Sequence, residues 1–185
     1  MIRKQCHGWY EGDALLETYH ANEWCKVIHD DQRQFELLCL EGASVGLSWK
    51  TIIHKRDEYR RAFSDFDIET CAAMTDDQLE HLLLNSSLIR NRSKIFSVRK
   101  NAQAVQQLQK EFGSFDSYIW GFTDGQPIDH KWQEMTDIPS VSSLSLRLSQ
   151  DMKKRGISFV GPIITYSFLQ AIGVVNDHLK TCPFR

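Results

Sequence analysis

The sequence predicts an all-α domain, and two observations carry that prediction. Apolar residues recur three and four positions apart over most of the 185 residues, a spacing that gives a helix one buried face. Sustained alternation of apolar and polar residues, which is typical of a half-buried strand, does not occur. The chain is 42% hydrophobic and has neither internal repeats nor low-complexity segments. We therefore expect one domain over residues 1–185.

Local signals place the first predicted helices. The apolar stretch 35–53 indicates one or two buried helices, and the run Val45–Ile53 is included in them. The segment Thr75-Asp76-Asp77-Gln78 has the pattern of a capping box, in which the side chains of the first and fourth residues satisfy backbone N–H groups. It predicts a short helix that continues through Leu84.

The second half of the chain follows the same logic. The spacing of apolar residues from Ile95 to Phe112 predicts a long helix, and Gly113 supplies its end. Residues 144–155 predict another helix, and a last one begins near Gly161-Pro162, since proline suits the first turn of a helix. The polar stretch Thr123–Ser140 lacks a clear period and is predicted to be a loop.

Composition bounds the compartment and the partners. No apolar run reaches the roughly 18 residues of a membrane span, and the start of the chain lacks an apolar signal stretch, so we expect a cytoplasmic protein without a membrane partner. Five scattered cysteines are a poor disulfide framework, and we expect reduced thiols. The formal net charge of −2 argues mildly against nucleic acid, so phosphate would have to meet a local basic face.

The two ends of the chain carry a candidate metal site. Cys6 and His20 lie near the N-terminus, and His178 and Cys182 lie near the C-terminus, four positions apart and therefore on one face of a helical turn. Two thiolates and two imidazoles make a closed tetrahedral set, which is typical of structural Zn²⁺. The alternative is that these are unrelated polar residues near the chain ends.

A second candidate site lies in the first 50 residues. Glu41 is a single carboxylate inside the apolar run 39–49, where a charge is costly unless a partner or a polar ligand compensates it. The alternative is a structural carboxylate that caps a helix or pairs with an arginine. Trp9, Tyr19, Trp24 and Trp49 are near it in sequence and could stack on a flipped base, although ordinary core packing explains such residues equally well.

A third candidate site is basic. Arg90, Arg92 and Lys94 lie between one predicted helix and the next, where a hairpin and a helix N-terminus can meet a phosphate. The basic run 153–155 could add a second contact. The alternative for both is a solvated, charged turn.

These features occur in an order that resembles the bacterial 3-methyladenine DNA glycosylase I family, the constitutive alkyladenine glycosylases of the helix-hairpin-helix superfamily. The resemblance runs from about Cys6 to Cys182. Its most specific stretches are Tyr19-His20-Ala21-Asn22-Glu23-Trp24, Leu40-Glu41-Gly42, Gly46-Leu47-Ser48-Trp49, Ile89-Arg90-Asn91-Arg92-Ser93-Lys94-Ile95, Phe159-Val160-Gly161, Tyr166-Ser167-Phe168 and Val175-Asn176-Asp177-His178.

The resemblance implies a helix-hairpin-helix glycosylase fold, with one structural Zn²⁺ linking the two terminal segments. It implies hydrolysis of the N-glycosidic bond of 3-methyladenine in double-stranded DNA that contains alkylated adenine, and we expect a monomer. Glu41 would read the purine as the catalytic residue, Tyr19 and Trp49 would sandwich it, and Trp9 and Trp24 would line the pocket.

The resemblance also assigns the remaining sites. Cys6, His20, His178 and Cys182 would hold the zinc ion. The hairpin that grips DNA would fall on residues 85–94, with Arg90, Arg92 and Lys94 as its contacts.

Several positions depart from the family pattern, His54 and Pro162 among them. The first zinc cysteine is expected two residues before Trp9, where His7 stands, and we favour the neighbouring Cys6 because the family ligand is a thiolate. Ser87 replaces the usual glycine of the hairpin, at a turn where we expect a need for positive φ. Cys25 likewise replaces a glycine.

Two other functions compete with the glycosylase. A degenerate homologue would bind damaged DNA without cleaving it. A zinc hydrolase would need an open coordination position, which a closed set of four ligands does not leave.

Overall fold

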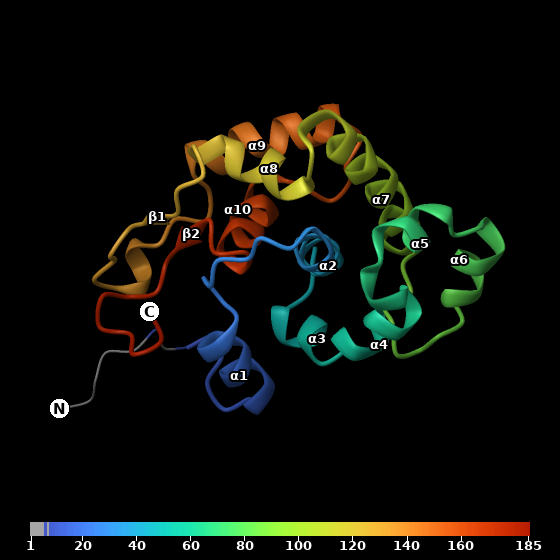
Figure 1. The fold of residues 1–185 in the computed structure, drawn as a ribbon. Coiled ribbons are helices and arrows are strands. Elements are labelled where there is room, and N and C mark those ends of the chain that lie inside the picture. Colours follow the sequence, from blue (N-terminus) through green and yellow to red (C-terminus); the bar gives the residue numbers. More distant parts are fainter. Residues whose placement is uncertain (1–5, 7) are drawn as a thin grey trace.

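The computed structural model describes residue 6 and residues 8–185, and Figure 1 shows their arrangement. The fold is mostly helical, as predicted, with two very short strands. The helices are α1 (Ala14–Asn22), α2 (Asp31–Ala43), α3 (Trp49–Ile53), α4 (Arg56–Ala62), α5 (Ile68–Ala73), α6 (Asp76–Leu82), α7 (Arg92–Phe112), α8 (Phe115–Trp120), α9 (Ser143–Lys154) and α10 (Pro162–Ala171). Three 3-10 turns, η1 (Ser64–Phe66), η2 (Gly121–Thr123) and η3 (Met135–Asp137), and the strands β1 (Ile128–Asp129) and β2 (Val175–Asn176) complete it.

Capping residues fix the helix ends. The predicted capping box of α6 is present, since Thr75 Oγ1 accepts from Gln78 N–H at 3.2 Å and Gln78 Oε1 accepts from Thr75 N–H at 2.8 Å. That helix ends at Leu82, two residues earlier than predicted. The long helix α7 stops at Gly113, whose φ of 89° few other residues tolerate, and Pro162 opens α10.

Helix α2 lies in the middle of the other elements (Figure 1), and every residue from Gln34 to Ala43 is buried. The expectation that Val45–Ile53 is helical was wrong for its first half. Gly46 has φ 76°, which ends the helical path, and α3 begins only at Trp49. Ser48 caps that new helix by accepting from Thr51 N–H at 3.2 Å.

The segment 123–140, predicted to be a loop, is mostly irregular but is not detached. Its strand β1 pairs in parallel with β2, with Ile128 opposite Val175, and Ile128 N–H donates to Val174 O at 2.8 Å. Two-residue strands are too short to show any alternation in sequence, which explains why they were missed. The pairing attaches this segment to the C-terminal part of the chain.

The N- and C-terminal segments lie side by side at one end of the molecule (Figure 1). They share an apolar cluster that is separate from the main core and contains Cys6, Tyr10, Leu16, Tyr19, Trp24, Cys25, Ile53, Leu179 and Cys182. Among the described residues, no helix is both long and apolar enough to cross a membrane.

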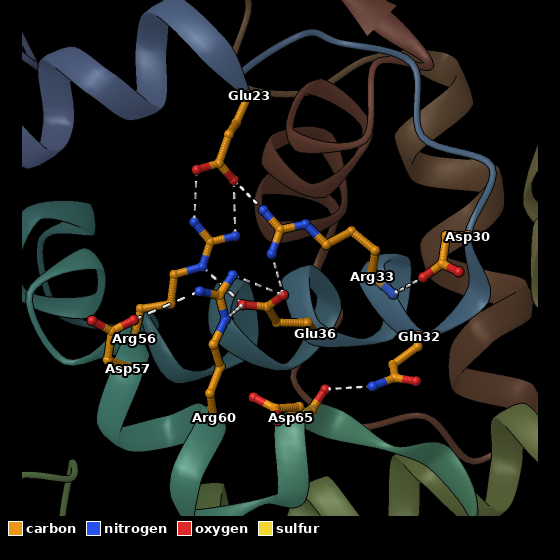
Figure 2. Close-up of polar contacts among 9 residues, drawn as sticks. All are labelled: Glu23, Asp30, Gln32, Arg33, Glu36, Arg56, Asp57, Arg60 and Asp65. Atoms are coloured by element: carbon orange, nitrogen blue, oxygen red, sulfur yellow. Dashed lines mark hydrogen bonds and ion pairs between the residues drawn. The ribbon is translucent and has the colours of Figure 1, made fainter.

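A partly buried ion network joins α1, α2 and α4 (Figure 2). At its centre, Glu36 on α2 accepts from Arg56 Nε and from Arg60 Nε at 2.8 Å each. Arg56 also donates to Glu23, at the end of α1, at 3.0 Å, and Arg33 binds both Glu23 and Glu36. These contacts fix the end of α1 and the start of α4 against α2.

Candidate functional site

A cavity of about 370 Å³ lies between α1, α2, α3, α10 and the segment 123–140. It collects all five pocket residues that the sequence singled out. Its lining is Trp9, Tyr19, Trp24, Glu41, Ser44, Trp49, Met135, Ile138, Pro139, Ser140, Ile163, Ile164, Tyr166, Ser167 and Gln170. The wall is predominantly apolar and aromatic, which is typical of a site that encloses a small organic ligand.

Glu41 lies near the end of α2 and is 6% exposed. Its carboxylate makes no hydrogen bond or ion pair with any residue that the structure describes, and burial raises its pKa from 4.5 to about 8. The other buried glutamate of the same helix, Glu36, is the one that pairs with arginines. The alternative of a structural, arginine-paired carboxylate therefore describes Glu36 and not Glu41.

The aromatic residues of the cavity contact one another. The ring centroids of Tyr19 and Trp49 are 5.5 Å apart at 55°, and those of Trp9 and Trp24 are 5.3 Å apart at 67°. A flat base between two parallel rings would need them about 7 Å apart. The expected sandwich between Tyr19 and Trp49 is therefore not present in this arrangement. Trp49 Nε1 is a buried donor without a partner among the described residues.

Sequence reasoning missed the opposite wall of the cavity. Tyr166, Ser167 and Gln170 come from α10, and Met135 and Ile138 come from the segment 123–140. These residues are more than 80 positions from Glu41, and no local pattern links them to it. Only the packing of α10 against α2 brings them together.

The four predicted metal ligands form a buried cluster. One ligand atom from each of Cys6, His20, His178 and Cys182 lies within 4.8 Å of all the others. Cys182 Sγ lies 3.3 Å from His178 Nδ1 and 3.9 Å from His20 Nε2, and Cys6 Sγ lies 3.7 Å from His178 Nδ1. The cluster could hold a metal ion. His7, the rival to Cys6, lies outside the described residues.

The surroundings of the cluster suit neutral imidazoles. Burial lowers the pKa of His20 and of His178 to about 4 each, so their ring nitrogens are free to bind a cation at neutral pH. The other ring nitrogen of His178, Nε2, lies 3.1 Å from Trp24 O, a contact that orients the ring. Burial raises the pKa of the Cys6 thiol to about 12, so a bound cation would be needed to stabilise its thiolate.

The backbone at Cys25 explains why the family pattern has a glycine there. Its φ is 61°, in the left-handed region that favours glycine. The thiol accepts from Asp177 N–H at 3.4 Å. Ser87 differs, because it is not among the residues with positive φ, and the expectation for that turn was wrong. Instead, Asn85 Oδ1 accepts from Ser87 N–H at 2.9 Å and forms the turn.

The three predicted DNA contacts have different environments. Arg90 is exposed, and the described residues offer its guanidinium no ion pair. Arg92 Nε donates to Glu80 at 2.8 Å, and its guanidinium lies over the ring of Phe96. Lys94 Nζ donates to two backbone oxygens at the end of α2, at 2.9 and 2.6 Å.

Comparison with known proteins gives a consistent result. The family model described as methyladenine glycosylase matches residues 9–185. The "DNA-3-methyladenine glycosylase 1" of Escherichia coli K12 is 41% identical and covers 95% of this chain and 94% of its own length. The "DNA-3-methyladenine glycosylase" of Haemophilus influenzae is 39% identical, with 95% of both chains covered.

A solved structure agrees with these relatives. A variant of 3-methyladenine DNA glycosylase I in complex with 3-methyladenine superposes with a TM-score of 0.92, at 33% identity, over 94% of this chain and 93% of that one. The match of sequence and fold thus extends over nearly the whole molecule. The chain belongs to the methyladenine glycosylase family.

Proposed function

We propose that this chain is a monofunctional DNA-3-methyladenine glycosylase, which hydrolyses the N-glycosidic bond of 3-methyladenine in alkylated DNA and so initiates base excision repair. The observation that carries the proposal is Glu41, a buried carboxylate without a partner that faces an aromatic cavity. A buried carboxylate without a partner destabilises the folded protein, and a bound cationic ligand would compensate for that cost.

The chemistry follows from the charge of the substrate. Adenine methylated at N3 carries a positive charge in DNA, so its glycosidic bond is already weakened. When the C1′–N9 bond breaks, its electron pair goes to the base, which leaves as neutral 3-methyladenine, and water adds to C1′ and loses a proton. The protein therefore needs to extract the base and stabilise it, and we name no protein nucleophile.

Glu41 would accept hydrogen bonds from the amino edge of the base and stabilise its cationic form. Trp49 Nε1 offers a complementary donor for a ring nitrogen. Because Tyr19 and Trp49 contact each other, the base would stack on the exposed side of this aromatic group, with Trp9 and Trp24 closing the pocket.

The hairpin around residues 85–94 would hold the duplex, with Arg90, Arg92 and Lys94 near phosphates. Arg90 is free for this role, Arg92 would exchange Glu80 for a phosphate, and Lys94 would act mainly by fixing the start of α7. We further propose a monomer in the cytoplasm.

One structural Zn²⁺ would be held by Cys6, His20, His178 and Cys182. Tetrahedral zinc with bonds of about 2.1 Å to nitrogen and 2.3 Å to sulfur separates its ligands by about 3.3–3.8 Å. The observed separations of 3.3, 3.7 and 3.9 Å lie in or close to that range. The ion would tie the terminal segments together. Four protein ligands leave no position for water, which argues against a zinc hydrolase.

The proposal is tested by incubating the protein with duplex DNA that has been treated with a methylating agent, and by chromatography of the released bases. We expect release of 3-methyladenine, unchanged by a chelator during a short assay. Tight binding of the damaged duplex without base release would instead establish the non-cleaving binder, and turnover that stops at once on chelation would favour the hydrolase.

A further inference from the structure

A second buried carboxylate lies behind the cavity wall. Asp177 is completely buried, directly after β2, and four side chains converge on it. Trp132 Nε1 lies 2.7 Å and His130 Nδ1 2.8 Å from Oδ1, while Tyr166 Oη lies 2.6 Å and Gln170 Nε2 2.8 Å from Oδ2. Two of these four partners, Tyr166 and Gln170, also line the cavity.

This arrangement fixes which way the amide of Gln170 faces. Gln170 Nε2 donates to Asp177 Oδ2, so the NH₂ group of Gln170 faces Asp177. A flipped amide would place its oxygen 2.8 Å from Oδ2, an atom that already accepts from Tyr166 Oη, and this hydrogen bond would be lost. The carbonyl Oε1 of Gln170 is left without a partner among the described residues.

The consequence concerns the choice between purines. At the sixth position of the ring, adenine carries an amino group that donates two hydrogen bonds, whereas guanine carries an oxygen that accepts. A carbonyl oxygen that faces the cavity would match the amino group of adenine and oppose the oxygen of guanine. In the proposed binding mode Glu41 accepts one amino hydrogen, and the other amino hydrogen needs a second acceptor.

We propose that Gln170 is a specificity-determining residue, and that Asp177 positions it so that its Oε1 accepts from the amino group of methylated adenine and disfavours methylated guanine. The inference rests on the proposed glycosylase function. It assigns Asp177 a role at the base pocket in addition to its place in the C-terminal segment, and it gives the pairing of segment 123–140 with β2 a function. That pairing brings His130 and Trp132 to the same carboxylate.

The experiment measures release of 3-methyladenine and 3-methylguanine from one methylated duplex by wild type, Gln170→Met and Asp177→Asn. Methionine keeps the length of the side chain and removes the acceptor. The amide introduced by Asp177→Asn both donates and accepts, so it would tolerate either orientation of the Gln170 amide. We expect the ratio of 3-methyladenine to 3-methylguanine, compared as kcat/KM, to fall about 10-fold in Gln170→Met, the size of one lost hydrogen bond to a base edge. The ratio should fall less in Asp177→Asn, because part of that protein keeps the original orientation of the Gln170 amide.

The matched control is Gln109→Met. Gln109 on α7 makes the same kind of bond, from its Nε2 to Asp31 Oδ2 at 2.7 Å, away from the cavity. We expect that variant to keep the wild-type ratio. An unchanged ratio in Gln170→Met, or an equal fall in Gln109→Met, would overturn the proposal. The double variant of Gln170 and Asp177 should show no further fall beyond Gln170→Met, and additive losses would remove the positioning role from Asp177.

Binding of the two free bases, followed by tryptophan fluorescence, separates this inference from the proposed function. If wild type releases no base at all, the glycosylase proposal fails. The dissociation constants of free 3-methyladenine and free 3-methylguanine then still test Gln170. We expect Gln170→Met to lower the preference for 3-methyladenine about 10-fold, the size of one lost hydrogen bond. The metal content of Asp177→Asn is measured alongside, since His178 is its neighbour.

Discussion

At the residue scale, two glutamates on one helix have opposite environments. Glu36 is surrounded by Arg33, Arg56 and Arg60, and although burial opposes its ionisation, these arginines hold its pKa below the usual value of 4.5. Glu41 has no such partner, and burial raises its pKa to about 8. The first carboxylate stabilises the fold, whereas the second is buried without such pairing, as the ligand-binding role that we propose for it requires.

The substitution Glu41→Gln should therefore stabilise the protein. Between pH 4.5 and about 8 the folded state holds a proton that the unfolded state releases, so this residue's contribution to stability is lost as the pH rises. We expect the variant to gain roughly 1–3 kcal/mol in free energy of unfolding at pH 8 and little at about pH 4. Urea denaturation at both pH values measures it.

Glu36→Gln is the matched control on the same helix. Its folded-state pKa is lowered, so its contribution is present at neutral pH and is lost as the pH falls. Removing its charge weakens the hydrogen bonds of three arginines, although Glu23 still pairs with Arg33 and Arg56, and we expect a loss of about 1–3 kcal/mol at neutral pH. Destabilisation of the same sign in both variants would contradict the assignment of Glu41 as an uncompensated ligand-binding group.

Gly173 shows a second constraint at single-residue scale. Its φ is 74°, and a Cβ atom there would lie 2.4 Å from the backbone carbonyl of Lys26. Gly125 has nearly the same φ, 73°, but open space around it. We expect Gly125→Ala to cost about 1–2 kcal/mol from its backbone conformation alone. Gly173→Ala should cost clearly more, measured by thermal unfolding, and equal costs would argue against the close approach.

At the element scale, helix ends could be predicted where a capping residue or a glycine marks them. The capping box at Thr75, the stop at Gly113 and the start at Pro162 are all confirmed. The turn at Gly46 was not predicted, because Val45 and Leu47 are apolar although the turn exposes both of them, so the apolar run continues through the break between α2 and α3. Nor do two-residue strands leave a periodic trace.

The junction of α2 and α7 gives a prediction at this scale. Lys94 binds carbonyls at the end of α2, whereas Arg90 is exposed and unpaired with any described residue. Lys94→Met should lower stability through the loss of these bonds, by about 1–3 kcal/mol. Arg90→Met should leave stability unchanged and weaken binding of a duplex. Because one phosphate contact is lost, the slope of log affinity against log salt concentration should decrease in magnitude by about 1.

Fluorescence anisotropy with a methylated duplex over a range of salt concentrations measures the binding, and urea denaturation measures the stability. The reverse pattern, with Arg90→Met unstable and Lys94→Met specifically defective in DNA affinity, would contradict the roles inferred from their contacts.

At the scale of the whole molecule, the terminal segments meet through the cysteine and histidine cluster. Cys6 Sγ also accepts from Leu179 N–H at 3.1 Å, so this cysteine joins the N-terminal segment directly to the C-terminal one. Binding of Zn²⁺ to the folded chain alone would stabilise it by mass action.

Elemental analysis should find about one zinc ion per chain, as a closed four-ligand site implies. Cys182→Ser should lose it and melt at a lower temperature, whereas Cys71→Ser, at a buried thiol remote from the cluster, should keep the metal. Wild-type protein that is free of metal and equally stable with and without a chelator would end the zinc proposal.

The pocket illustrates what sequence can supply at this scale. Glu41 and its aromatic neighbours lie within 50 residues, and a charge in an apolar run draws attention to them. Gln170 and Asp177 carry no comparable signal in the sequence. Their hydrogen bond becomes informative only once the structure shows that Gln170 also lines the cavity. Likewise, the contact between the rings of Tyr19 and Trp49 depends on side-chain geometry that the sequence does not reveal.

The central claim is that the protein cleaves 3-methyladenine from DNA in the cavity that contains Glu41. It is tested most directly by single-turnover release of that base from a methylated duplex at saturating protein, comparing wild type with Glu41→Gln. The account predicts that the variant folds at least as stably and releases the base about 100-fold more slowly, the scale of a lost electrostatic contact to developing charge. Release by Glu41→Gln at the wild-type rate would contradict it.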